Sequence, residues 1–180
     1  PIVLVGQKIL KGQVLAEAQG NISAPIHAPV SGTVFAIGDV TAPHPSGLPF
    51  RAITIDSDFA NQWIETDIVA DPFSLRPEEI ARRAAAAGVV GLGGATFPTA
   101  VKFALGKRLA VTTLIVNGGE CEPYLSSDDR IMRDFADQVI DGARLVMHAI
   151  GAREALVGIE DNKPEAIAAM RKAAAPFAEV

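Results

Sequence analysis

The distribution of glycine and proline divides this sequence near residues 67–72 and limits the folds open to it. Before that point the chain consists of short β-prone runs separated by Gly and Pro, and no window repeats apolar residues at helical spacing. The runs cover residues 2–5, 13–16, 22–27, 32–37 and 51–55. After that point, helical windows alternate with short β-branched strands, a pattern typical of an α/β unit with parallel strands. We therefore expect an all-β domain over 1–66 and an α/β domain over 67–180.

The second region can be divided further from its capping and breaking residues. We expect helices over 74–87, 98–108 and 164–175, one or two helices over 126–150, and buried strands over 113–116 and 155–159. The same alternation predicts a third strand at 178–180. Because a two-stranded α/β sheet is small, we expect the natural protein to continue beyond residue 180.

Composition excludes several classes of function. The 180 residues contain 16 Lys and Arg against 21 Asp and Glu, a net charge of −5. This balance argues against a nucleic-acid-binding surface held by counterion release. The single cysteine rules out a disulfide framework within the chain. The uncharged window 84–101 is interrupted by Pro98 and four glycines, so we expect no membrane span.

Two segments of the β region, 5–15 and 23–34, look like the halves of a barrel-sandwich hybrid, the fold of lipoyl and biotinyl carrier domains. In a carrier, a lysine at the tip of the central hairpin holds the cofactor, but the hairpin over 17–22 contains no lysine. A docking or lid module is therefore favoured over a carrier. His27 and His44 have no second metal ligand at a suitable spacing, which favours ordinary surface or turn histidines.

A glycine-rich segment from Gly91 to Thr99 leads directly into the helix that contains Lys102. Glycines allow a ligand to approach the backbone closely, the helix N-terminus offers free N–H groups, and the lysine adds a full positive charge. These features predict a phosphate site, although a structural turn remains the alternative. The spacing matches neither a Walker loop nor the dinucleotide fingerprint.

A second loop, Asn117 to Tyr124, follows the expected strand at 113–116 and places two carboxylates around Cys121. Loops at the carboxyl ends of α/β strands line ligand crevices. A metal site lacks a second cysteine or a spaced histidine, and neighbouring carboxylates suppress the thiolate. The favoured role is therefore hydrogen-bond acceptance from ribose hydroxyls or from an amino group.

Together, segments 91–102 and 114–130 closely resemble the RnfC component of the Rnf electron-transport complex. They are similar, more distantly, to the flavin- and NADH-binding 51-kDa-type subunit of respiratory complex I. The barrel-sandwich region resembles the N-terminal domain of the same Rnf component. The resemblance implies a mixed α/β chain, with a barrel-sandwich hybrid followed by a truncated Rossmann-like domain that binds non-covalent FMN and NAD(H).

The resemblance also implies roles for individual residues. The glycines that would pass close to the flavin are Gly91, Gly93 and Gly94. The side chains that would contact FMN are Lys102, through the phosphate or ribityl chain, and Asn117 and Glu120, through hydrogen bonds. Those that would meet NADH are Phe97 and Glu122. Three positions depart from the complex I pattern: Leu92 replaces an arginine, Thr96 a glycine and Gly119 an aspartate.

The parent protein is thereby expected to exchange a hydride between nicotinamide and FMN and to pass electrons to [4Fe–4S] clusters in a C-terminal part that lies beyond residue 180. Expected partners are NADH and the other subunits of the Rnf membrane complex, with a peripheral position on the cytoplasmic face of the bacterial inner membrane. The isolated fragment is expected to be inactive. Two alternatives remain: a non-catalytic assembly module, and a hydrolase that uses Cys121.

Overall fold

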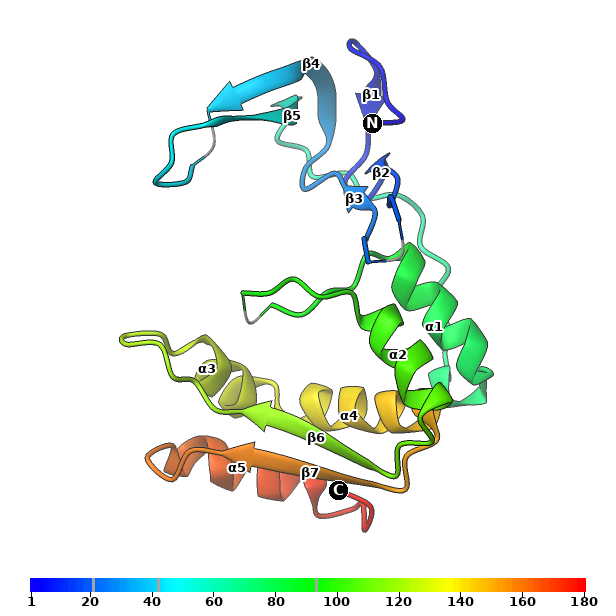
Figure 1. Cartoon of the computed structure of the whole chain (residues 1–180), viewed down its shortest axis with the longest axis vertical. Helices are drawn as coiled ribbons and strands as arrows, with labels where there is room; N and C mark the ends of the chain where they lie inside the picture. Colours follow the sequence, from blue (N-terminus) through cyan, green and yellow to red (C-terminus); the bar gives the residue numbers. More distant parts are fainter. Residues whose placement is uncertain (21, 42, 93) are drawn as a thin grey trace. The chain divides into compact units, whose positions relative to one another are not determined.

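The computed structural model describes residues 1–20, 22–41, 43–92 and 94–180. These residues form two compact units. The first unit contains residues 1–70 and 83–99, and the second contains 71–82 and 100–180. The elements of both units are labelled in Figure 1.

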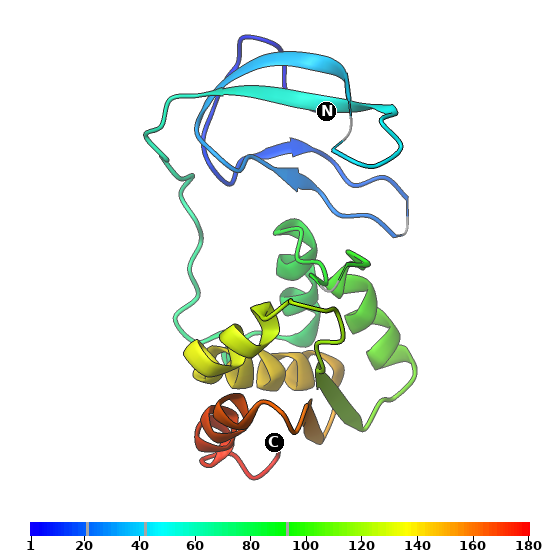
Figure 2. The same ribbon diagram turned by 90° about the vertical axis from the view of Figure 1, so that its left-hand side faces the viewer.

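Five strands form the β part of the first unit: β1 (Lys8–Ile9), β2 (Val14–Ala16), β3 (Ile26–His27), β4 (Gly32–Thr41) and β5 (Pro49–Ser57). They make a three-stranded antiparallel sheet in the order β1-β4-β5 and a separate two-stranded antiparallel sheet of β2 and β3. Figure 2 shows both sheets. Within the described part of the chain, these strands do not close into a single barrel.

The core of the first unit lies between these sheets and contains one apolar side chain from most of the β segments. Its buried members are Val3, Ile9, Leu15, Ala28 and Val34. At the first position of β4, only glycine fits, because a Cβ on Gly32 would lie 2.1 Å from the carbonyl oxygen of Asp56 on β5. The buried positions of β4 are Gly32 and Val34, so the strand contributes to the core at its start.

The expected all-β character of the first region is confirmed, but the ends of several strands differ. Residues 2–5 form no strand, although Ile2 donates a backbone hydrogen bond to Leu15 (2.9 Å). β4 and β5 extend beyond the expected strands at 32–37 and 51–55, because their backbones pair as far as Thr41 and Pro49, with a register shift between Val34 and Ala36.

Residues 83–99 belong to the first unit although they follow its strands by more than twenty residues. They include the last residues of helix α1 (Pro77–Ala86). Gly88 ends this helix with φ of 65°, and its N–H donates to Ala85 while that of Val89 donates to Ala84. This is the Schellman arrangement, in which a glycine in the left-handed region terminates the helix.

The remaining elements belong mainly to the second unit. They are η1 (Pro72–Ser74), α2 (Thr99–Arg108), β6 (Thr113–Gly118), α3 (Ser127–Asp134), α4 (Ala136–Ile150), β7 (Glu154–Ile159) and α5 (Pro164–Ala174). The expected helices and both expected strands form, with small shifts at their ends, and the expected helical segment 126–150 forms two helices, α3 and α4. The expectation that both strands are buried is wrong, because Ile115 on β6 is 70% exposed and Leu156 on β7 is 56% exposed. None of the helices in the described ranges is long and apolar enough to cross a membrane.

β6 and β7 pair in parallel, with Thr113 opposite Glu154 and Gly118 opposite Ile159. Helices α3, α4 and α5 cover one face of this pair (Figures 1 and 2). Their core contains Met132, Ile140, Ala166, Met170 and Ala173. The parallel pairing brings the carboxyl ends of both strands to the same edge, where the loops after β6 and β7 begin.

The prediction of a third strand at 178–180 is wrong. Residues 178 and 179 form a turn, Ala155 on β7 donates a backbone hydrogen bond to the Glu179 carbonyl (2.7 Å), and Val180 packs against the core of the second unit. Arg144 instead binds this segment, because its guanidinium lies 3.7 Å from the centre of the Phe177 ring and 3.3 Å from the Glu179 carboxylate. Side-chain contacts with α4 thus take the place of strand pairing.

Candidate functional site

The glycine-rich segment of the first unit is a loop whose base is closed by backbone hydrogen bonds. Gly91 donates to the Phe97 carbonyl (2.9 Å), and Thr99 donates to the Val89 carbonyl (3.0 Å). Val90 and Pro98 form an antiparallel bridge between these bonds. The N–H of Gly91 is therefore used inside the loop.

The tip of this loop is open. Leu92 is 90% exposed, and a Cβ placed on Gly94 would meet nothing within 4 Å. Gly94 has φ of 94° and Thr96 has φ of 48°, so both residues occupy the left-handed region. Phe97 is half-buried. Gly93, another expected flavin contact, lies outside the described residues.

Lys102 lies in the first turn of α2, which directly follows the loop in sequence. Its side chain is exposed, and it makes no ion pair within the described parts of the chain. The first turn of α2 contains no acidic residue. The positive end of the helix and the lysine are thus uncompensated by a local carboxylate, which suits a bound anion.

The loop after β6 begins where the strand packs tightly against α3. Gly118 is buried, and a Cβ there would lie 2.7 Å from the sulfur of Met132 and 2.9 Å from the Gly158 carbonyl. Asn117 is exposed, and its Oδ1 accepts a hydrogen bond from the N–H of Gly119 (3.0 Å). The amide side chain therefore stabilises the turn that leaves the strand.

Glu120 binds the N-terminus of α3. Its Oε1 accepts hydrogen bonds from the backbone of Asp128 (3.0 Å) and from the hydroxyl of Ser127 (3.1 Å). Its Oε2 lies 3.5 Å from the backbone nitrogen of Asp129 and 3.7 Å from Nζ of Lys163. The side chain is only 3% exposed. The carboxylate acts as a helix cap brought in from a preceding loop.

These contacts lower the pKa of Glu120. The largest cause is the backbone hydrogen bond from Asp128; those from Ser127 and Asp129 and the charge of Lys163 act in the same direction, while burial opposes them. Hydrogen bonds to the ionised form favour that form. Glu120 is therefore held as a carboxylate.

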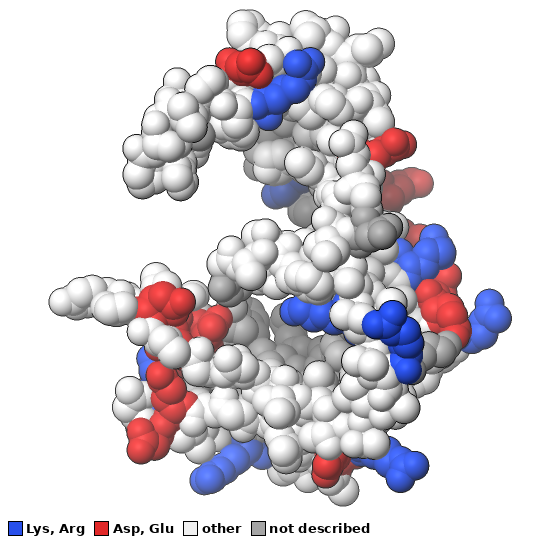
Figure 3. Space-filling view, viewed as in Figure 1, with Lys and Arg blue, Asp and Glu red and all other residues white. Residues whose placement is uncertain are grey.

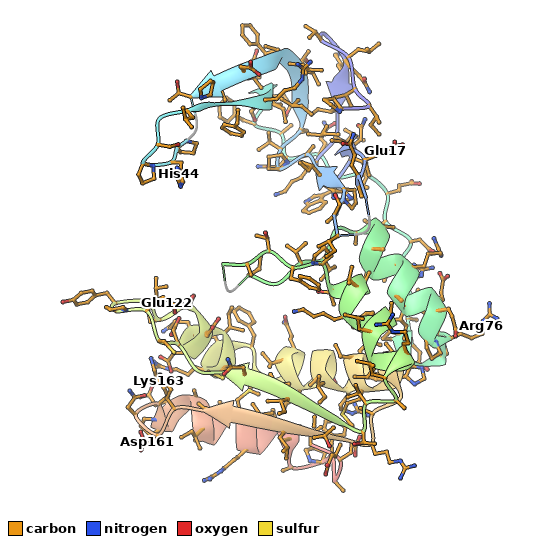
Figure 4. The ribbon with its side chains drawn as sticks, in the orientation of Figure 1. Glu17, His44, Arg76, Glu122, Asp161 and Lys163 are labelled. Carbon is orange, nitrogen blue, oxygen red and sulfur yellow. The ribbon has the colours of Figure 1, made fainter. Side chains whose placement is uncertain are left out.

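Glu122 lies on the exposed part of the same loop, as do Cys121 and Tyr124. Figure 4 shows Glu122 and Lys163 at the edge of the sheet where β6 and β7 end. Figure 3 shows carboxylates gathered over this loop and α3. Across the described ranges, no three His, Cys, Asp or Glu side chains are grouped so that they could hold a metal ion.

The expected site residues fall into two sets. Gly91, Gly94 and Phe97 belong to the first unit, whereas the second unit contains Lys102, Asn117, Glu120 and Glu122. Sequence reasoning missed Lys163, which contacts Glu120, and His27, which contacts α1. No local pattern marks either contact, because each partner is distant in sequence.

Two family models match the chain. The RnfC barrel sandwich hybrid domain matches residues 1–60. The Nuo51 FMN-binding domain matches residues 84–179, which is more than half of the chain. The second match includes both the glycine-rich loop and the loop after β6.

Curated relatives share about half of their residues with this chain over the aligned part. The RnfC-type subunit of the ion-translocating oxidoreductase complex of Rhodobacter capsulatus is 51% identical over 96% of this chain and 33% of the relative. Its Pseudomonas aeruginosa counterpart is 51% identical over 94% of this chain and 22% of the relative. The Haemophilus influenzae counterpart is 44% identical over 96% of this chain and 26% of the relative. The chain thus spans a third or less of the length of these relatives.

A solved structure is also similar. It is a crystal structure of an NAD⁺-reducing [NiFe]-hydrogenase in the H₂-reduced state, 30% identical, with a TM-score of 0.51 over 59% of this chain and 20% of that one. The chain belongs to the Nuo51 FMN-binding domain family and is a homologue of the RnfC proteins of ion-translocating oxidoreductase complexes.

Proposed function

We propose that this chain binds FMN and forms part of a subunit that exchanges electrons between NAD(H) and FMN. The observation that carries the proposal is Lys102: an exposed cation in the first turn of a helix without acidic residues there, directly after an open glycine loop. This arrangement lies inside the segment that matches an FMN-binding domain.

The chemistry of the described residues fits the phosphate end of FMN. A phosphate needs cationic and N–H donors, and a lysine at a helix N-terminus supplies them. Gly94 leaves open space where a Cβ would be, so a ligand can approach the backbone there. Residues 91–102 therefore supply the type of donors and the accessibility that this part of FMN requires.

The individual assignments extend to both loops. In this proposal Gly91 and Gly94 would contact the flavin, as would Gly93, which lies outside the described residues. Lys102 would bind the phosphate or ribityl chain, and Asn117 would hydrogen-bond the FMN. The carboxylate of Glu120 already accepts hydrogen bonds from Ser127 and Asp128 at the start of α3. We therefore assign it a smaller role in binding FMN than in holding α3. Phe97 and Glu122 meet NADH. Residues 67–180 contribute a Rossmann-like FMN- and NADH-binding domain.

The bound flavin supplies the hydride and single-electron chemistry. The side chains of this chain would bind and orient the flavin and exclude water from it, and none of them needs to transfer a proton. Lys102 balances the phosphate charge, the glycines allow close approach, and the carboxylate of Glu120 fixes the start of α3 and thereby the loop that carries Glu122.

The relatives are named as subunits of an ion-translocating oxidoreductase complex. We extend this to the present chain as a proposal: its partners are NADH and the other subunits of an Rnf membrane complex. In the same proposal, [4Fe–4S] clusters outside residues 1–180 would accept the single electrons that bound FMN supplies. The complex holds it peripherally at the cytoplasmic face of the membrane.

Titration of the whole chain with FMN, followed by flavin fluorescence, tests the proposal. Loss of one charge-assisted phosphate contact is expected to weaken binding about tenfold or more in Lys102→Ala. Lys172→Ala is the matched control, because it removes the same charge from the exposed end of α5. Equal affinities of the two variants would contradict the assignment of Lys102.

A second candidate is an assembly module that binds no cofactor by itself. The exposed apolar side chains of the first unit favour it: Leu4 is 74% exposed, Phe35 69% and Leu48 66%. Where such residues lie together, they are typical of surfaces that contact partner proteins. Absence of FMN binding at any accessible concentration, together with binding to another protein of the complex, would favour this candidate.

A further inference from the structure

We propose that His27 is a positioning residue for the glycine-rich loop. The residue lies on β3 and is half-buried. Its Nε2 lies 3.1 Å from the carbonyl oxygen of Ala86, 59 residues later in the chain. Because a carbonyl oxygen only accepts, Nε2 carries the hydrogen and donates it.

The Ala86 carbonyl needs such a donor. It lies at the C-terminal end of α1, where the last carbonyls have no partner within the helix. The Schellman bonds of Gly88 and Val89 use the carbonyls of Ala85 and Ala84, not that of Ala86. His27 therefore donates a hydrogen bond to the Ala86 carbonyl, which the Schellman bonds do not use.

Gly88 brings the two segments even closer. A Cβ at this position would lie 2.9 Å from the Pro25 carbonyl and 3.2 Å from the imidazole of His27. With φ of 65°, the residue also has a backbone conformation that alanine adopts only with strain. The end of α1 thus rests against the segment that carries β3.

From this contact, a short and well-bonded stretch leads to the loop. Val89 follows Gly88 directly, and its carbonyl accepts from Thr99 at the base of the loop. The next residues, Val90 and Gly91, pair with Pro98 and Phe97. The base of the loop is therefore held against the β part of the first unit, and His27 is a side-chain link in that attachment.

A further link acts beside it. The guanidinium of Arg83, one turn before Ala86, lies 2.6 Å from the carboxylate of Asp67 and donates to the Asp67 carbonyl (3.1 Å). Asp67 is 80% exposed, so this pair contributes little by itself. The contact of His27 is the more specific of the two because it joins a β3 side chain to the end of the helix.

This inference rests on the proposed function in one respect: the ligand that benefits from the fixed loop is FMN. The β region then has a role in cofactor affinity, in addition to any docking role. Loss of the hydrogen bond in His27→Ala is expected to weaken FMN binding by about three- to tenfold. His27→Gln retains an N–H donor and is expected to recover most of the affinity.

The experiment measures amide hydrogen exchange and FMN affinity on the whole chain, for His27→Ala, His27→Gln and the control His44→Ala. His44 is on the exposed loop between β4 and β5, and its side chain bonds only to Ser46 among the described residues. We expect faster exchange at Gly91 and Thr99 in His27→Ala alone, with unchanged exchange at Val34 as the measure of an intact fold.

Equal exchange at Gly91 and Thr99 in the unmodified chain and all three variants would overturn the proposal, as would equal FMN affinity of His27→Ala and the unmodified chain. If exchange at Val34 also rises in His27→Ala, that variant has lost its fold and His27→Gln becomes the test. The proposal then requires that His27→Gln protects the Gly91 amide as well as the unmodified chain does. If the unmodified chain binds no FMN, the proposed function fails, and the exchange result alone still decides whether His27 positions the loop.

Discussion

The carboxylate of Glu120 lies 3.7 Å from Nζ of Lys163, and the same carboxylate accepts hydrogen bonds from the first turn of α3. This relationship connects the loops that follow β6 and β7, the two parallel strands of the second unit. A side chain expected to bind a cofactor is thus also part of the framework of its own loop.

Glu120→Gln is expected to lower the melting temperature at neutral pH and to lose this effect in acid. The pKa of Glu120 is lowered in the folded state, mainly by the backbone hydrogen bond from Asp128. The ionised carboxylate therefore stabilises the fold above its ordinary pKa of 4.5, and this stabilisation disappears as the pH falls through the lower folded-state pKa. Thermal unfolding followed by circular dichroism from pH 7 to 3 measures the difference.

Glu122→Gln is the control, because it changes an exposed carboxylate on the same loop. Its melting temperature should differ little from that of the unmodified chain at either pH. A gap between Glu120→Gln and the unmodified chain that stays constant from pH 7 to 3 would contradict the assigned role.

Ser127→Ala is expected to raise the pKa of Glu120 more than Lys163→Met does. After the Asp128 backbone bond, the hydroxyl of Ser127 is the next contact that lowers this pKa, and the charge of Lys163 acts more weakly from 3.7 Å. A direct hydrogen bond outweighs a partly exposed charge. Carbon-13 NMR titration of the carboxyl group measures both shifts, and a larger shift in Lys163→Met would refute the ranking.

Gly118→Ala is expected to destabilise the second unit by about 1–3 kcal/mol, a typical cost of overpacking. The added Cβ would lie 2.7 Å from the Met132 sulfur and 2.9 Å from the Gly158 carbonyl. Gly158→Ala is the matched control on the neighbouring strand, since its Cβ would meet nothing within 4 Å. It should change stability by less than about 0.5 kcal/mol. Urea unfolding measures the stability of both variants. Equal stabilities would contradict the close packing of β6 against α3 at Gly118.

Ser31→Ala is expected to destabilise the first unit by about 1–3 kcal/mol, because it removes a buried hydroxyl that both donates and accepts a hydrogen bond. The Ser31 hydroxyl is fully buried, donates to Asp58 (2.6 Å) and accepts from the backbone of Gln62 (3.0 Å). Ser46→Ala, on the exposed loop between β4 and β5, is the control and should be nearly neutral. Chemical unfolding followed by the fluorescence of Trp63 compares the two variants, and equal stabilities would show that the buried hydroxyl contributes nothing.

Local signals were sufficient for the order and type of most helices and strands, although not for the expected strands at 2–5 and 178–180. Pro77 at the start of α1, Gly88 at its end, and Gly151 with φ of 75° after α4 all act within a few residues of themselves. The same holds for the apolar runs 113–116 and 155–159, which form most of β6 and β7. The glycine-rich loop was also recognised from its own residues.

The prediction of a third strand at 178–180 was wrong. A strand forms only where its backbone pairs with a neighbouring strand, and the alternation of helices and strands along the sequence does not show whether this pairing occurs. In the structure, Arg144 on α4 binds Phe177 and Glu179 through its guanidinium and takes the place of that pairing. The contacts of Arg144 with Phe177 and Glu179 join residues that are far apart in sequence, so the local pattern at 178–180 does not predict them.

The sequence by itself determined which segments become helices and strands, where a phosphate-type loop precedes a lysine, and which family the motifs resemble. Only the tertiary structure decided that Glu120 caps α3 beside Lys163 and that His27 donates to Ala86. The physical reason is the range of the interactions. Backbone preferences and caps act over a few residues, whereas these hydrogen bonds and charges join residues that become neighbours only when the chain has folded.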